Sequence, residues 1–145
     1  MPERRHNAPT RRPTHPGRSA SRRRAIRGRR GGVRVIDVLS RARRATRDLF
    51  EVLETGGRLQ VAFMSLAPGQ TSGEPSAHVD ADQLIYVLSG TGKAEVAGRT
   101  YRLPTGSLAV IPAGAVHQIR NTGTEPMTSL NVYAPPEYAP RYRER

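Results

Sequence analysis

One stretch of sequence decides the fold of this chain, GSLAVIPAGAVHQIRN, which runs from Gly106 to Asn121. An apolar run ends at Pro112, and the pair Ala113-Gly114 is typical of a turn between two short strands. Strand alternation then places His117 on the same side as Ile119. An imidazole that faces the interior of a β-structure is a candidate metal ligand.

Five positions of this stretch have a fixed spacing, namely Gly106, Pro112, Gly114, His117 and Asn121. A lone histidine beside apolar residues fits a structural role as readily as a ligand role, so the case for a site depends on this spacing. The pattern resembles the second conserved motif of the cupin superfamily, and every fixed position is filled. The resemblance implies a jelly-roll barrel in which a first motif lies opposite His117 across a metal ion.

The first cupin motif is matched only in part. It reads roughly His, one residue, His, three or four residues, Glu, six residues, Gly. Here Gly90 fills the glycine position, Gln83 stands at the glutamate position, and His78 falls at the second histidine. Ser76 replaces the first histidine, and His78 and His117 are the two histidines outside the N-terminal tail. The resemblance therefore implies a metal site made of His78, Gln83 and His117.

This ligand set is weaker than that of the family, because one imidazole is missing and an amide replaces a carboxylate. Asp80 and Asp82, or Glu74 and Ser76 with less support, are alternatives that would supply a further oxygen. Each of these side chains also fits a solvated loop. Imidazole and oxygen ligands suit a divalent metal ion such as Zn, Fe, Mn, Ni or Cu, without selecting among them.

Charge is distributed unevenly along the chain. Residues 1–34 contain 12 arginines and one acid, whereas residues 35–145 contain 12 Lys and Arg against 11 acids. The first 34 residues have almost no apolar side chains to bury, so we expect a disordered tail. The tail is interpreted either as a simple solvated extension or as a contact for nucleic acid. Without interleaved aromatic residues, such a contact would be salt-sensitive and unspecific.

Three absences narrow the class of protein further. The chain has no cysteine, which excludes disulfides and thiolate metal sites. No apolar run approaches the roughly 18 residues of a membrane span, and no apolar segment follows the basic start as in a signal peptide. We therefore expect a cytoplasmic protein that makes no membrane contact.

The remaining elements are predicted from alternation and turn residues. We expect a short helix over 36–43 and a β-hairpin over 49–66, followed by strands at 84–88, 93–96, 100–103 and 128–134. About eight short strands after one helix fit an all-β sandwich or barrel. With the resemblance, this becomes a cupin jelly roll, the double-stranded β-helix barrel. We expect the cupin domain over 35–138 and a frayed C-terminus over 139–145.

The two sides of strand 84–88 are both apolar, so its outer face is expected to lie under a second sheet or a partner subunit. The resemblance also implies a homodimer. The candidate walls of the ligand pocket are Ile85, Val87, Ile119 and Phe63.

The residues His78–Gln83 and Tyr133–Glu137 resemble a subgroup of small single-domain cupins that is labelled mannose-6-phosphate isomerase-like. The leading hypothesis is a metal-binding cupin that acts on or senses a small polar molecule, a sugar or an organic acid. Isomerase- or oxygenase-type chemistry at the metal is left open, and so is whether the protein is an enzyme. The alternative is a non-catalytic ligand-binding or sensor module, which the missing histidine and glutamate favour.

Overall fold

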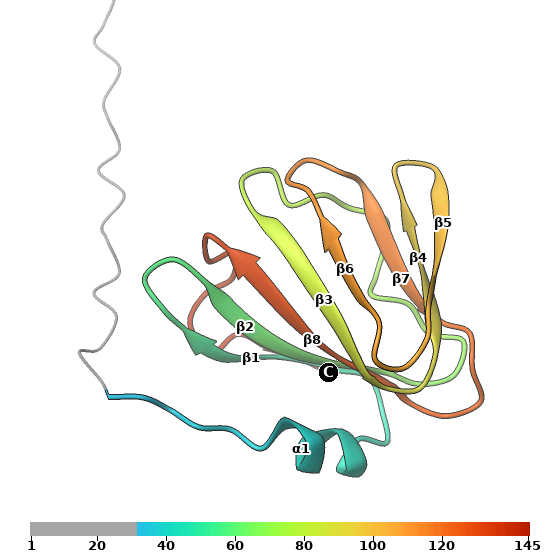
Figure 1. Ribbon diagram of the computed structural model, residues 1–145, viewed down its shortest axis with the longest axis horizontal. Coiled ribbons are helices and arrows are strands. Elements are labelled where there is room, and N and C mark those ends of the chain that lie inside the picture. Colours follow the sequence, from blue (N-terminus) through green and yellow to red (C-terminus); the bar gives the residue numbers. More distant parts are fainter. Residues whose placement is uncertain (1–31) are drawn as a thin grey trace, which may run out of the picture.

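The computed structural model describes residues 32–145, which form one short helix and nine strands (Figure 1). The helix is α1 (Val38–Arg44). The strands are β1 (Leu49–Thr55), β2 (Gln60–Leu66), β3 (Asp82–Ser89), β4 (Gly92–Val96), β5 (Arg99–Leu103), β6 (Leu108–Ile111), β7 (His117–Asn121), β8 (Met127–Ala134) and β9 (Arg143–Glu144). The predicted all-β fold is confirmed. The tail predicted over residues 1–34 lies outside the described residues, except for its last three positions. Its predicted disorder and nucleic-acid contact therefore stay predictions.

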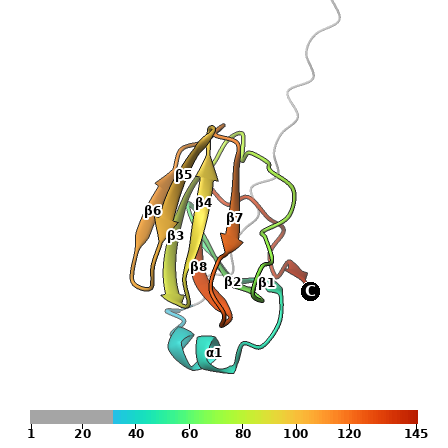
Figure 2. The same cartoon turned by 90° about the vertical axis from the view of Figure 1, so that its right-hand side faces the viewer.

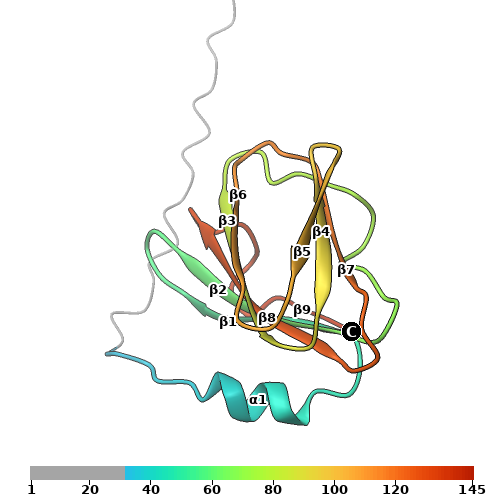
Figure 3. The same ribbon diagram turned by 45° about the vertical axis from the view of Figure 1, so that its right-hand side comes forward.

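The strands form two antiparallel sheets that face each other (Figures 1 and 3). The large sheet has the order β6-β3-β8-β2-β1-β9, and the small sheet has the order β5-β4-β7. Figure 3 shows α1 on the outer side of the large sheet, opposite the small one. The inner faces of the two sheets therefore enclose the core and the site described below.

The core between the sheets is apolar at one end and polar at the other. Ile85 and Ile119, from opposite sheets, are almost completely buried in the largest apolar cluster. Burying such a side chain stabilises the fold by roughly 1.5–3 kcal/mol. At the other end, the strand register places Gln60, Tyr133 and Gln83 in one row across β2, β8 and β3. Polar side chains thus line the interior where the site lies.

Helix α1 covers the outer face of the large sheet. The Asp37 carboxylate caps it by accepting a hydrogen bond from the Ser40 N–H at 2.9 Å. Its buried Ala42 packs with Leu53 and Phe63. The prediction that Phe63 lines the ligand pocket is therefore wrong. Strand alternation predicts which residues of β2 share a face. It does not predict that α1 covers the face that carries Phe63.

The C-terminal residues are attached to the sheet, where the sequence predicts a frayed end. Strand β9 pairs with β1, and the Val52 N–H donates to the Tyr142 carbonyl at 2.8 Å. The Tyr142 ring stacks on Tyr138 with the ring centroids 5.3 Å apart. Figure 2 shows the C-terminus beside β1. The C-terminus is ordered because it bonds to β1, which is far away in the sequence and which local patterns could not reveal as its partner.

The outer side of β3 is only partly covered. Leu88 packs beside the α1 cluster, whereas Tyr86 is 38% exposed. On the neighbouring edge strand β6, Leu108 and Val110 are more than half exposed. Among the described residues, no second sheet lies over this face. These residues also include no helix long and apolar enough to cross a membrane.

Candidate functional site

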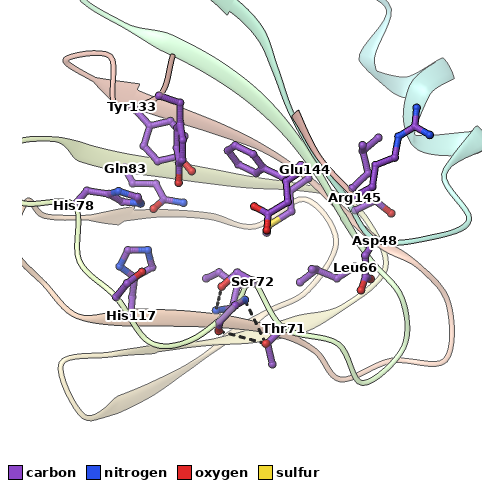
Figure 4. A pocket seen from close by; sticks show the side chains of 18 residues that line it. Asp48, Leu66, Thr71, Ser72, His78, Gln83, His117, Tyr133, Glu144 and Arg145 are labelled. Atoms are coloured by element: carbon purple, nitrogen blue, oxygen red, sulfur yellow. Dashed lines mark hydrogen bonds between the residues drawn. The ribbon is translucent and has the colours of Figure 1, made fainter. Parts of the chain in front are cut away.

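A cavity of about 270 Å³ lies between the two sheets. His78, from the loop before β3, lines it together with Gln83 of β3 and His117 of β7. The ring centroids of the two histidines are 5.3 Å apart. Figure 4 shows the rings facing each other at one end of the cavity, with the Gln83 amide beside them. The structure thus brings together the three side chains that the sequence analysis selects.

Backbone hydrogen bonds bring the two histidine segments together. Ser76 and His117 form an isolated antiparallel bridge, with N–H to O distances of 3.1 and 2.9 Å between the two residues. The Gly114 N–H donates to the His78 carbonyl at 2.8 Å. Gly114 has φ +83°, a conformation that glycine adopts without strain, so the turn between β6 and β7 needs this residue. The spacing of the motif therefore fixes where both histidines lie.

His117 is held as a neutral imidazole with one free nitrogen. Its side chain is buried, and its Nδ1 lies 3.0 Å from the Ala115 carbonyl oxygen. Because a carbonyl only accepts, Nδ1 carries the proton and Nε2 keeps its lone pair. Burial lowers the pKa of His117, the bond to Ala115 opposes this, and the neighbouring His78 lowers the pKa further. The unprotonated form that binds metals is favoured.

His78 is oriented through its other ring nitrogen. Its Nδ1 lies 3.3 Å from a carboxylate oxygen of Glu137, which follows β8. Its ring also meets the edge of Tyr133, with centroids 5.0 Å apart. A carboxylate at one imidazole nitrogen fixes the tautomer and leaves the other nitrogen for a ligand, as in many metal sites.

Gln83 presents an oxygen that has no partner. Its Nε2 donates to Asn131 Oδ1 at 3.0 Å, and the Asn131 amide in turn donates to Ser129 Oγ at 3.2 Å. This chain of bonds fixes the direction of the Gln83 amide. The Gln83 Oε1 atom is buried and accepts no hydrogen bond from any residue of the described range 32–145. An unsatisfied buried group costs about 1–3 kcal/mol, so this oxygen calls for a donor or a cation.

The other oxygen ligands considered from the sequence lie differently. Asp82 is used structurally, because its Oδ1 accepts the Ala113 N–H at 2.9 Å. Asp80 and Glu74 are exposed and do not line the cavity, whereas Ser76 does. Within residues 32–145, no group of three or more His, Cys, Asp or Glu side chains is arranged to hold a metal ion. Any metal here would depend on the amide of Gln83.

The predicted apolar walls are found only in part. Ile119 lines the cavity, but Ile85 and Val87 are buried in the core cluster behind it. This difference follows from position along β3, because Gln83 occupies the end nearest the cavity. The next inward-facing residues lie deeper between the sheets.

Several polar residues of the cavity are not among the site residues predicted from the sequence. The phenols of Tyr133 and Tyr138 and the carboxylates of Asp48 and Glu144 all line it. Burial raises the pKa of both Tyr133 and Tyr138, so both remain protonated hydroxyl donors. Tyr133 could have been found, because it alternates inward on a predicted strand. Glu144 gives no such signal in the sequence.

Comparisons with known proteins bear on the family and the fold of this chain. A family model described as "Cupin domain" matches residues 62–133. The uncharacterized protein YrkC of Bacillus subtilis (strain 168) is 30% identical over 106 residues, which are 69% of this chain and 56% of that protein. The alginate biosynthesis protein AlgA of Pseudomonas fluorescens is 30% identical over 83 residues, 57% of this chain. The chain thus spans about half of YrkC and 17% of AlgA.

A solved structure supports the fold independently. The crystal structure of BH2720 from Bacillus halodurans superposes with a TM-score of 0.72 at 28% identity, covering 81% of this chain and 92% of that one. The two-sheet architecture described above is therefore shared by nearly the whole of that protein.

Proposed function

This chain carries a cupin domain over residues 62–133, and from that premise we propose that it binds a small polar molecule beside a divalent metal ion. The metal ligands would be His78, Gln83 and His117. The observation that carries the proposal is their convergence on one cavity with an unpaired, buried amide oxygen among them. The narrower likeness to mannose-6-phosphate isomerase-like cupins remains part of this proposal and concerns ancestry rather than a reaction.

The donor set fits a divalent transition metal ion. Both imidazoles have Nδ1 directed at an oxygen, Glu137 for His78 and the Ala115 carbonyl for His117. Both therefore offer Nε2, and Gln83 adds Oε1. Two nitrogens and one neutral oxygen leave coordination positions for water or a ligand. Zn, Fe, Mn, Ni and Cu all accept such donors.

A bound divalent ion would act as a Lewis acid that polarises a carbonyl or hydroxyl group of the ligand. The residues of this chain supply binding and orientation. The phenols of Tyr133 and Tyr138 remain protonated and hydrogen-bond to each other, which leaves one of the two protons for a ligand oxygen. Ile119 and Phe50 supply apolar wall that excludes water from part of the cavity.

A non-catalytic ligand-binding or sensor module is the second candidate, and one observation favours it. Among the described residues, two carboxylates beside the candidate ligands are already engaged, because Asp82 accepts the Ala113 N–H and Glu137 is directed at His78. Thermal-shift screening with and without a chelator separates the two candidates. A ligand that stabilises metal-stripped protein and is never converted indicates a binding module, whereas turnover that requires the metal indicates an enzyme.

The metal is tested by elemental analysis of purified protein and of two variants. In His117→Ala, the metal found in the wild type should be lost, because one of two imidazoles is removed. The control is Val116→Ala, which alters the preceding residue, whose side chain is 52% exposed. Unchanged metal content in His117→Ala would remove the proposed site.

A homodimer also remains a proposal. The surface that it would cover is the exposed apolar group of Tyr86, Leu108 and Val110 on β3 and β6. Because β6 is the edge strand of the large sheet, a second copy would also satisfy its free backbone groups.

A further inference from the structure

The C-terminal strap, which we define as residues 135–145, forms one wall of the cavity. Gln60, a fully buried residue of β2 in the large sheet, holds it. The Gln60 Nε2 donates to the Tyr138 carbonyl at 2.9 Å, and its Oε1 accepts the Tyr138 N–H at 2.8 Å. Strand β9 within the strap pairs with β1. The strap is thus bonded to the large sheet at two places along its length, at Tyr138 and at β9.

The strap brings a negative charge to the cavity. Figure 4 shows the Glu144 carboxylate pointing into the cavity, and the guanidinium of Arg145 turned away from the two histidines. The Tyr142 hydroxyl donates to Glu144 Oε2 at 3.1 Å, which leaves Oε1 for a ligand. A second carboxylate, Asp48, lines the same cavity and accepts the Ala67 N–H at 2.7 Å.

No lysine lines this cavity, and among the described lining residues Arg145 is the one arginine. A phosphate or carboxylate ligand is normally held by arginine, lysine or a row of backbone N–H groups. Here an anion would instead meet the carboxylates of Asp48, which is partly buried, and of Glu144, which is exposed and whose repulsion water therefore weakens. A divalent ion at the site would add two positive charges, which the carboxylates of Glu144, Asp48 and Glu137 together outnumber, so the cavity offers an anion no net attraction.

The neutral groups of the cavity suit hydroxyl groups. The hydrogen-bonded phenol pair of Tyr133 and Tyr138 leaves one hydroxyl proton to donate, and Glu144 Oε1 is an acceptor, whereas Gln83 Oε1 is taken by the metal ion. A hydroxyl group both donates and accepts, so a polyol can satisfy both kinds of partner. The volume of about 270 Å³ lies near the lower end of small-molecule sites, which begin at about 300 Å³. A ligand no larger than a monosaccharide fits this space.

We infer that the cavity takes an uncharged, hydroxyl-rich molecule of up to monosaccharide size, and that Glu144 excludes its phosphorylated or acidic counterparts. This inference rests on the proposed function, because it names the ligand class of the same cavity. The sequence leads us to expect either a sugar or an organic acid as the ligand, and this inference keeps the sugar and excludes the acid.

The test is isothermal titration calorimetry of the metal-loaded full chain with matched pairs of probes. The pairs are D-mannose with D-mannose 6-phosphate, D-glucose with D-glucose 6-phosphate, and glycerol with glycerol 3-phosphate. At least one neutral member should bind, and its phosphorylated partner should bind at least about tenfold more weakly. In Glu144→Gln this ratio should fall severalfold, and in the control Glu125→Gln, an exposed loop residue, it should not change.

Two results would overturn the inference: no binding by any neutral member, or phosphorylated members that bind as tightly as neutral ones. An unchanged ratio in Glu144→Gln would overturn the role of that residue. The metal content of the same samples separates this failure from that of the proposed function. If the wild type holds metal through His117 but prefers phosphate esters, only the ligand class is wrong.

Discussion

Gln83→Glu tests the unusual ligand most sharply, because it restores the residue type that the cupin motif has at this position. In the metal-free protein the new carboxylate would face Asn131 Oδ1, which now accepts a hydrogen bond from Gln83 at 3.0 Å. The Asn131 amide can turn over, since Ser129 Oγ can donate as well as accept. The buried chain of bonds would then run in the opposite direction and remain complete.

The magnitude follows from burial and from ligand charge. Gln83 is 4% exposed, so an ionised carboxylate there is poorly hydrated. We expect the metal-free variant to lose about 1–3 kcal/mol of unfolding free energy at neutral pH. We expect Zn²⁺ affinity to rise by roughly 10–100-fold, because an anionic oxygen replaces a neutral one at the ion. The two effects have opposite signs, which a general disturbance of packing would not produce.

The assay is competition for Zn²⁺ against a chromogenic chelator, combined with urea unfolding of the metal-free protein. Gln70→Glu, the same substitution at an exposed position, is the control and should change neither quantity appreciably. A folded Gln83→Glu variant with unchanged or lower Zn²⁺ affinity would refute the view that the Gln83 oxygen faces the ion.

Three further predictions concern other parts of the structure. Because the pKa of His117 is lowered in the fold, its contribution to stability is present above the unfolded pKa of about 6.5 and is lost as the pH falls through the folded value. Urea unfolding at pH 7 and pH 5 should therefore show a smaller loss on acidification for metal-free His117→Ala than for the wild type; an equal loss would contradict this. Gln60→Ala should destabilise the protein by about 2–4 kcal/mol and speed hydrogen exchange over 136–144, since it removes the buried amide that holds the strap; unchanged exchange there would count against the strap. Light scattering should find a dimer for the wild type and a monomer for Val110→Lys, and a monomeric wild type would end that proposal.

The local part of the site could be predicted from the sequence, because it depends on short spacings. The turn at Gly114 and the alternation of β7 together place His117 inward, and both are written within a few residues. His78 and Gln83 are likewise found from a short spacing, because both lie in one segment that matches part of the first cupin motif. These features need no knowledge of the rest of the chain.

The remainder of the site depends on contacts between distant residues, which no local pattern reveals. Gln60 and Tyr138 are 78 positions apart, and the two residues of β9 are too few to be recognised as a strand. Phe63 shows a related limit, since alternation groups residues by face without saying which face α1 will cover. Glu144 likewise lines the cavity through contacts with distant residues, so its position can be assigned only from the structure.

The most direct test of the metal proposal is anomalous X-ray diffraction from crystals of the metal-loaded protein, measured at the absorption edge of the bound metal. We predict one peak in the cavity about 2.0–2.2 Å from Nε2 of His78 and of His117 and from Oε1 of Gln83. A map with no peak between the two imidazoles, or with its peak on other residues, would contradict the proposal.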